Sequence, residues 1–286
     1  NTKENGFETL IVNWLVNENG YEQGTNADYN QEYAIDEERL FRYLQSTQPR
    51  DLAELRILDT PAEKKKFLEI LRKGFKYKNK TLDFYQVLPS KGNQRAQELY
   101  DENIFSVTRQ LQYSKEYGRL ALDLCIFLNG LPIITMELKN QFTLQNTADA
   151  VKQYKTDRDP AEKLFSFKRC IVHFAVDDNE IMMCTELKKD DSYFMPFNKG
   201  FEDGAGNPPN PNGIKTDYLW KDILTKREFS KILENYVQIV ADKDEDTGKT
   251  SYKQIFPRYH QLKAVTMLLD RAKKEGAGQR YLIQHS

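Results

Sequence analysis

Three charged residues interrupt an otherwise apolar stretch of the chain, and their types and spacing could hold a metal ion. Asp123, Glu137 and Lys139 lie within residues 120–140, where most other side chains are aliphatic or aromatic. Burying one unpaired charge is costly, so three charges in such a stretch need a reason. Glu137 and Lys139 are two apart, which places them on one face of a strand. The set predicts an oxygen-rich Mg²⁺ site with a lysine beside it, the alternative being a buried ion pair with a spare acid.

The position of Asp123 relative to Glu137 depends on how this stretch turns. Asn129 and Gly130 form a dipeptide that tolerates positive φ and indicates a β-hairpin. A regular two-residue turn would put the two carboxylates on opposite faces. A three-residue loop, or a bulge near Pro132, would set Asp123 directly across from Glu137. We expect the latter arrangement.

These residues also carry a resemblance to a known family. Asp123, thirteen further residues and then Glu137-Leu138-Lys139 resemble the PD-(D/E)xK nuclease core, although Leu122 stands where that motif has proline. The sequence of the hairpin is similar to that of the N-terminal nuclease of HsdR, the restriction subunit of type I restriction-modification enzymes. The resemblance implies an α/β, restriction-endonuclease-like mixed sheet flanked by helices, with catalytic Asp123, Glu137 and Lys139. It also implies that the Leu138 carbonyl helps to hold the metal.

Two helices resemble the same family. Residues 7–16 have the apolar spacing of an amphipathic helix, and in the family a glutamate on this helix can approach the metal, which makes Glu8 a candidate ligand; a solvent-facing acid is the alternative. A second helix is predicted over residues 147–156. There Gln153 matches the glutamine of a Gln-x3-Tyr motif associated with DNA contact, but Asp157 stands where the tyrosine belongs. A plain polar helix face is the alternative.

The most basic segment, residues 61–80, interleaves lysines and arginines with aromatic residues. Such a segment could neutralise DNA phosphates and release counterions. The candidate contacts are Lys64, Lys65, Lys73 and Lys76. The alternative is a helix whose basic face is simply solvated.

The remaining elements follow from periodicity and turn residues. A lone histidine, His173, falls in a predicted strand and is expected in the core. Helices are expected at 35–45, 217–224 and 227–240, strands at 105–112, 168–176 and 180–185, and a loop at 194–214.

The domain prediction is a nuclease over residues 1–240, a charged linker over 241–252 and the beginning of a RecA-like motor lobe over 253–286. The tail resembles the family's motor entry, with one helix and a strand over 281–284, and Gln261 stands where related helicases read adenine. No Walker A loop occurs in the sequence, so ATP is expected to serve the full-length enzyme rather than this stretch. The chain begins without methionine and is expected to be a fragment.

Composition excludes several classes of protein. The 286 residues carry a formal net charge of −1, so bulk charge favours no particular partner. Three scattered cysteines suit a reducing cytoplasm, and no apolar run is long enough for a membrane span. The resemblance implies an endonuclease that cleaves double-stranded DNA with Mg²⁺ inside an ATP-dependent translocating complex with modification and specificity subunits. The alternative is a catalytically silent DNA-binding or docking domain.

Overall fold

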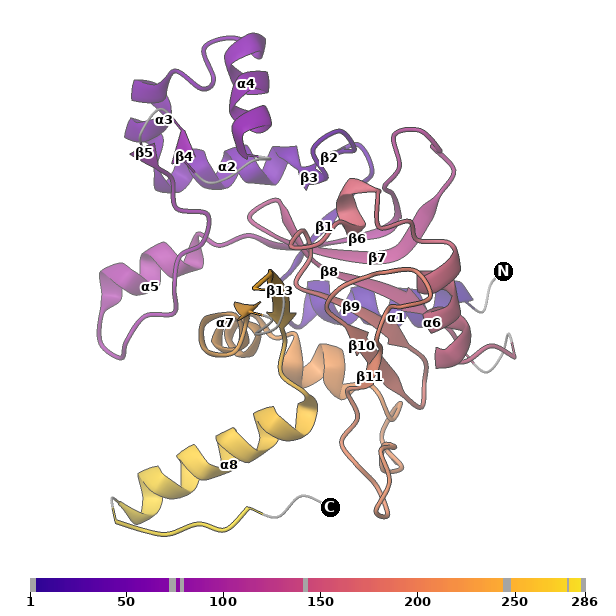
Figure 1. Ribbon diagram of the computed structural model, residues 1–286. Coiled ribbons are helices and arrows are strands. Elements are labelled where there is room, and N and C mark those ends of the chain that lie inside the picture. Colours follow the sequence, from indigo (N-terminus) through magenta and orange to yellow (C-terminus); the bar gives the residue numbers. More distant parts are fainter. Residues whose placement is uncertain are drawn as a thin grey trace.

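A seven-stranded mixed sheet forms the body of the protein in the computed structural model, which describes residues 4–71, 76–77, 80–140, 144–243, 248–276 and 278–283 (Figure 1). The strand order is β1-β6-β7-β8-β9-β10-β11, with β1 parallel to β6, β8 parallel to β9 and the other neighbours antiparallel. The strands are β1 (Glu22–Gly24), β6 (Phe105–Gln112), β7 (Ala121–Leu128), β8 (Leu131–Leu138), β9 (Val172–Val176), β10 (Ile181–Cys184) and β11 (Met195–Pro196). The expected restriction-endonuclease-like arrangement of a mixed sheet flanked by helices is confirmed.

Helices cover both faces of this sheet. α1 (Glu4–Asn17) belongs to the larger core together with α7 (Lys226–Asn235) and a π-helical turn, η3 (Leu219–Ile223). α6 (Thr147–Thr156) belongs to the smaller core on the other face. Apolar residues repeat at helical spacing in α1 and α6, so each helix buries one stripe against the sheet. The sequence prediction of α6 has the bounds that the structure shows.

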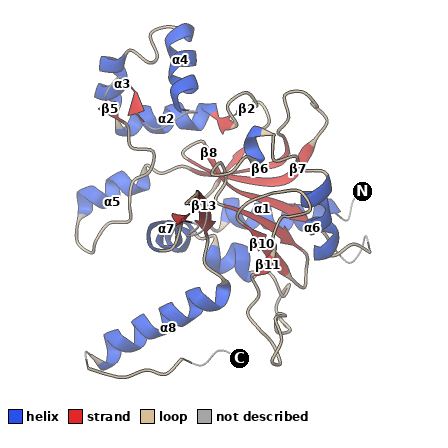
Figure 2. Ribbon diagram, in the orientation of Figure 1, coloured by secondary structure: helices blue, strands red, loops and turns tan. Residues whose placement is uncertain are grey.

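A helical subdomain stands beside one end of the sheet and has its own apolar core (Figures 1 and 2). Asp36 caps the first of its helices by accepting a hydrogen bond from the Arg39 backbone N–H at 3.0 Å. Its elements are α2 (Glu37–Thr47), α3 (Pro49–Leu55), α4 (Pro61–Leu71), β2 (Tyr29–Asn30), β3 (Ile35–Asp36), β4 (Lys76–Tyr77) and β5 (Lys80–Thr81), and α5 (Gln94–Asp101) follows.

The C-terminal third differs most from the sequence expectations. The helix expected at 227–240 ends at Asn235, and β12 (Gln238–Lys243) then pairs with β13 (Thr250–Ile255). A hairpin therefore occupies the region of the expected linker. Its strands are exposed apart from Gln254 and lack the alternation that marks a half-buried strand, so periodicity could not reveal them.

Smaller corrections concern strand ends. The strand expected at 168–176 begins at Val172, because Lys168 has a φ of 71°. Part of the expected loop at 194–214 forms β11 at the sheet edge. Residues 281–283 form no strand, since no neighbouring strand pairs with them among the described residues.

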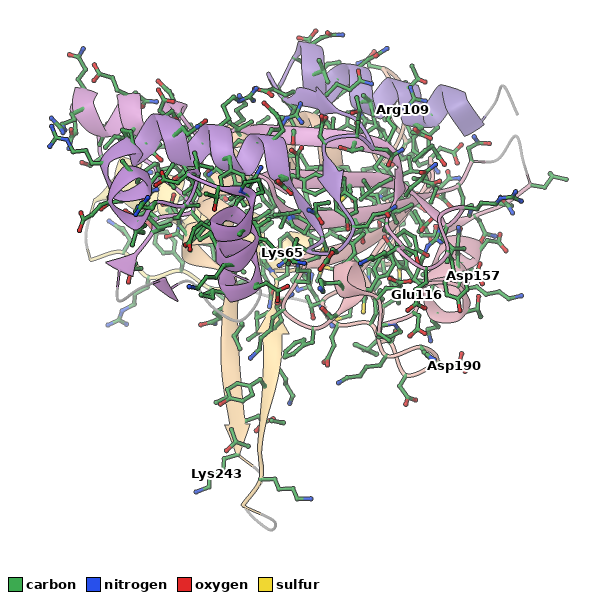
Figure 3. All side chains as sticks on the ribbon, turned by 90° about the horizontal axis from the view of Figure 1, so that it is seen from above. Lys65, Arg109, Glu116, Asp157, Asp190 and Lys243 are labelled. Atoms are coloured by element: carbon green, nitrogen blue, oxygen red, sulfur yellow. The ribbon has the colours of Figure 1, made fainter. Side chains whose placement is uncertain are left out.

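The hairpin and the last helix project from the body. Figure 3 shows β12 and β13 as an arm with Lys243 near its far end. In Figure 1, α8 (Tyr259–Glu275) extends away from the sheet. No described helix is both long and apolar enough to cross a membrane. The division into domains and the RecA-like identity of the tail stay predictions.

Candidate active site at the β7–β8 hairpin

The register of the β7–β8 hairpin brings the two acids together. Leu124 pairs with Met136, so the next pair outward sets Asp123 across from Glu137. A bulge produces this register, because Ile133 has no partner on β7. Directly opposed residues of an antiparallel pair share a face of the sheet. The expected arrangement is confirmed, through a bulge beside the predicted turn.

The turn itself is fixed by Asn129 and Gly130, which have φ values of 51° and 78°. Positive φ at both positions is typical of a two-residue hairpin turn with strand-compatible twist. The Asn129 side chain accepts a hydrogen bond from the Ile104 N–H at 2.7 Å and donates to the Phe84 carbonyl at 2.9 Å. The Gly130 carbonyl accepts from the Asp36 N–H at 2.8 Å. The turn therefore anchors both the hairpin and the helical subdomain.

Glu137 is completely buried, yet only one of its oxygens has a partner. The Arg158 Nε lies 2.5 Å from Oε1, whereas Oε2 has no hydrogen-bond partner. Burial, and then the nearby charge of Asp123, raise the pKa of Glu137 to about 8; Arg158 and Lys139 oppose this shift. An unsatisfied buried oxygen is costly, so this atom is suited to receive a ligand.

Asp123 is half-buried and links the hairpin to two neighbouring elements. Its Oδ2 accepts a hydrogen bond from the Leu138 N–H at 2.7 Å, and its Oδ1 accepts from the Gln110 amide at 3.2 Å. The same amide donates to Glu8 Oε2 at 2.9 Å. Glu8 is 4% exposed and also pairs with the Arg109 Nε at 2.5 Å. The candidate ligand Glu8 is thus one shared amide away from Asp123, with both of its oxygens occupied.

Gln110 holds an unusual backbone conformation at this junction. Its φ of 45° lies in the left-handed region, which is sparsely populated by residues other than glycine. Strained residues of this kind cluster at functional sites. This conformation and the shared amide place Gln110 in the site, and sequence reasoning gave no sign of it.

The donor set suits Mg²⁺. Within the described ranges, no group of three or more His, Cys, Asp or Glu side chains is placed to hold a metal ion. The side-chain ligands available to an ion at this site are therefore the two carboxylates of Asp123 and Glu137. Mg²⁺ is commonly held by one or two carboxylates, with water and substrate phosphate completing its octahedron. Lys139 follows β8 directly and is half-buried, with its backbone N–H bonded to the Val176 carbonyl at 2.9 Å.

The predicted DNA-contact residue on α6 lies on a helix with two well-defined ends. The N-terminus has a capping box of Asn146 and Asp149, and Asp157 forms the C-cap. Gln153 is half-buried between these ends. Asp157, which stands where the family motif has tyrosine, therefore serves as a helix cap, and Gln153 stays a candidate DNA contact.

The predicted basic contacts lie in the helical subdomain. Lys64 forms an ion pair with Glu37 at 2.6 Å and its Nζ sits 4.5 Å from the Phe41 ring centre, whereas Lys65 on α4 is exposed. Lys73 lies outside the described residues, and Lys76 belongs to β4. This subdomain contacts the turn end of the hairpin, about five strand residues or ~17 Å from Asp123. Of the basic residues whose side chains the structure describes, Lys64 and Lys65 therefore do not cluster with the acids.

His173 is a core residue, as its sequence context predicted. Its Nδ1 shares a 2.7 Å hydrogen bond with the Thr135 hydroxyl, which is also 2.9 Å from the Tyr154 hydroxyl. Burial lowers the pKa of His173 to about 3, so the ring is neutral at physiological pH. Through the Thr135 hydroxyl, Tyr154 therefore supports β8, the strand that carries Glu137.

Gln261, the candidate nucleotide contact, caps α8. Its side-chain oxygen accepts a hydrogen bond from the Arg258 N–H at 2.8 Å. The Gln261 backbone N–H donates in return to the Arg258 carbonyl at 3.1 Å, so Gln261 stabilises the first turn of α8. A role in reading a nucleotide stays a prediction.

Arg158 is a second residue of the site that the sequence analysis missed, after Gln110. It follows the α6 C-cap and is 21 residues from Glu137, so no local spacing rule connects the two. The only sequence signal is an arginine just beyond the C-terminal end of the helix that follows the Glu-x-Lys strand.

Comparisons with known proteins place these observations in a family context. The family described as "Type I restriction enzyme R protein N terminus" matches residues 1–192. A putative type I restriction enzyme endonuclease subunit, MjaVIIIP, from Methanocaldococcus jannaschii is 26% identical over 172 residues, which are 60% of this chain and 15% of the relative. The type I restriction enzyme HindI endonuclease subunit from Haemophilus influenzae is 30% identical over 104 residues, 35% of this chain and 9% of the relative. The matched stretches therefore cover a small part of either relative.

Proposed function

Because the chain belongs to the family of type I restriction enzyme R protein N termini, we propose that it is a Mg²⁺-dependent endonuclease domain that cleaves double-stranded DNA. The observation that carries this proposal is the pairing of Asp123 with Glu137 across adjacent strands, with one Glu137 oxygen buried and unpartnered. Lys139, two residues further along, completes the set. A silent docking domain would have no use for an unsatisfied buried carboxylate oxygen.

The chemistry divides among the three side chains. Asp123 and Glu137, with the Leu138 carbonyl, would hold Mg²⁺. The bound ion would supply a Lewis acid for a phosphate oxygen and lower the pKa of a water ligand. Lys139 would orient the attacking water or stabilise negative charge on the phosphorus centre, as preorganised charges do in other active sites. The Leu138 N–H fixes one oxygen of Asp123 and thereby limits its rotation.

DNA binding and assembly form the outer part of the proposal. Lys65 on α4 and Gln153 on α6 would contact the phosphate backbone, which gives affinity without sequence reading. Such binding suits an enzyme whose target is recognised by specificity and modification subunits in the cytoplasm. ATP-dependent translocation would belong to the motor region of the same complex.

Calorimetric titration of Mn²⁺ or Mg²⁺ into this chain tests the site directly. Replacing Asp123 with alanine is expected to weaken binding at least ~100-fold, because one of the two carboxylates is lost. Asp190→Ala provides the matched control, since it removes the same charge from an exposed position. Equal affinities for the wild type and Asp123→Ala would exclude the proposed metal site.

The metal affinity is expected to depend on pH below about 8. Burial raises the pKa of Glu137 to about 8, so the metal-free chain is mostly protonated at this residue near neutrality. A cation must then displace the proton. Affinity should therefore rise with pH, by up to ~10-fold per unit, and level off above about 8. Titrations in two buffers of different ionisation enthalpy measure the released proton, and a flat profile from pH 6 to 8 would contradict the assignment of Glu137.

A further inference from the structure

Arg158 makes more contacts around the candidate site than an ion pair with Glu137 alone would require. Its guanidinium uses all three nitrogens: Nε lies 2.5 Å from Glu137 Oε1, Nη1 is 3.1 Å from the Tyr113 hydroxyl and Nη2 is 2.9 Å from the Ala121 carbonyl. The Arg158 side chain is only 5% exposed. It is therefore fixed in place and too buried to contact DNA.

The geometry of this contact leaves one carboxylate oxygen free. Arginine and a carboxylate usually meet through two parallel hydrogen bonds. Here Tyr113 and Ala121 occupy the two terminal nitrogens, so Arg158 reaches only Oε1 of Glu137. The other oxygen, Oε2, is buried without a partner. A single rigid contact thus sets the rotation of the carboxylate and reserves its second oxygen.

We propose that Arg158 is a positioning residue of the metal site, which holds Glu137 through one oxygen so that the other is presented to the cation beside Asp123. This inference rests on the proposed function. The end of α6 delivers Arg158 to the sheet, since the residue follows directly on the C-cap Asp157. Outer residues that orient metal ligands typically contribute 10- to 100-fold in affinity.

The planar, forked shape of the Arg158 guanidinium, and not its charge alone, allows it to orient Glu137. Lysine keeps the positive charge but has one nitrogen, so it cannot bind Glu137, Tyr113 and Ala121 in fixed directions at once. Arg158→Lys therefore separates orientation from charge. Tyr113→Phe removes a single support, because the Tyr113 hydroxyl holds Nη1.

The test measures Mn²⁺ affinity by calorimetry on this chain, at one pH and ionic strength, together with thermal unfolding. Arg158→Lys and Arg158→Met are expected to bind Mn²⁺ about 10- to 100-fold more weakly, and Tyr113→Phe a few-fold more weakly. Arg169→Lys is the matched control: Arg169 is a half-buried arginine, which donates to the Ala34 carbonyl at 2.6 Å outside the site. It should lower the melting temperature and leave Mn²⁺ affinity unchanged.

The possible outcomes separate the two proposals. Wild-type affinity in Arg158→Lys would show that charge suffices, and tighter binding in Arg158→Met would show that the arginine competes with the cation; either result overturns the positioning role alone. Absence of Mn²⁺ binding by the wild type would overturn the proposed function itself. Should Arg158→Met fail to fold, Arg158→Lys and Tyr113→Phe still decide the question.

Discussion

Replacing Lys139 with alanine is expected to slow cleavage of double-stranded DNA by at least ~100-fold, with Mg²⁺ affinity almost unchanged. Lys139 lies two residues after Glu137, so its side chain leaves the same face as the two acids. In the proposed mechanism it contributes no ligand to the cation, and its charge would lie where negative charge develops on the phosphate. Because such a contact strengthens in the transition state, its loss should reduce the rate more than the binding of metal.

The rate is measured as conversion of supercoiled plasmid to open circles in the presence of Mn²⁺ or Mg²⁺. Lys243→Ala is the control, since Lys243 lies near the far end of the β12–β13 arm, which projects from the body (Figure 3). Asp123→Asn should abolish both cleavage and metal binding. The two variants therefore distinguish a metal ligand, Asp123, from a residue that stabilises charge in the transition state, Lys139. Unchanged cleavage in Lys139→Ala would remove this lysine from the mechanism.

The strands of the candidate site could be predicted because local signals agree there. Asn129 and Gly130 mark the turn, and continuous apolar runs flank them. The bulge at Ile133 was the decisive feature, because shifting the register by one residue moves Asp123 to the other face of the sheet. The position of Pro132 close to the turn indicated a bulge. A bulge was also an arrangement that would bring Asp123 and Glu137 together.

The contacts that tune the site could not be predicted in the same way. Arg158 and Gln110 reach the acids from α6 and β6, so their roles depend on tertiary packing. Sequence spacing describes neighbours along a strand or helix, but it does not say which elements meet across the sheet. The resemblance to a Gln-x3-Tyr motif directed attention to Asp157, whereas the next residue, Arg158, makes the contact with Glu137.

The arm and the tail show the limits of composition as a guide. A charged, glycine-containing stretch over 241–252 is typical of a linker, but part of it pairs as a hairpin. Both strands of that hairpin are largely exposed, and its Gln254 side chain donates to the backbone carbonyls of Cys170 and Ile171, at 2.7 Å each. Such long-range anchoring leaves no periodic pattern in the sequence.

Gly130→Ala is expected to destabilise the whole chain by roughly 3–5 kcal/mol, the sum of a left-handed backbone penalty and a severe clash. A Cβ at Gly130 would lie 2.3 Å from the Asp36 carbonyl oxygen and 2.6 Å from the Leu40 backbone nitrogen. Both are backbone atoms at the start of α2, so neither can turn aside as a flexible side chain would. The turn must therefore shift, and the register that pairs Asp123 with Glu137 should loosen with it.

Chemical denaturation with and without saturating Mn²⁺ measures both consequences, the free energy of unfolding and the metal affinity. Gly92→Ala is the matched control, because Gly92 also has a positive φ, of 84°, but nothing lies within 4 Å of its added Cβ. It should cost only the backbone penalty of about 1–2 kcal/mol. The difference between the two variants isolates the close approach of the turn to α2, and equal losses would show that this contact does not hold the hairpin in register.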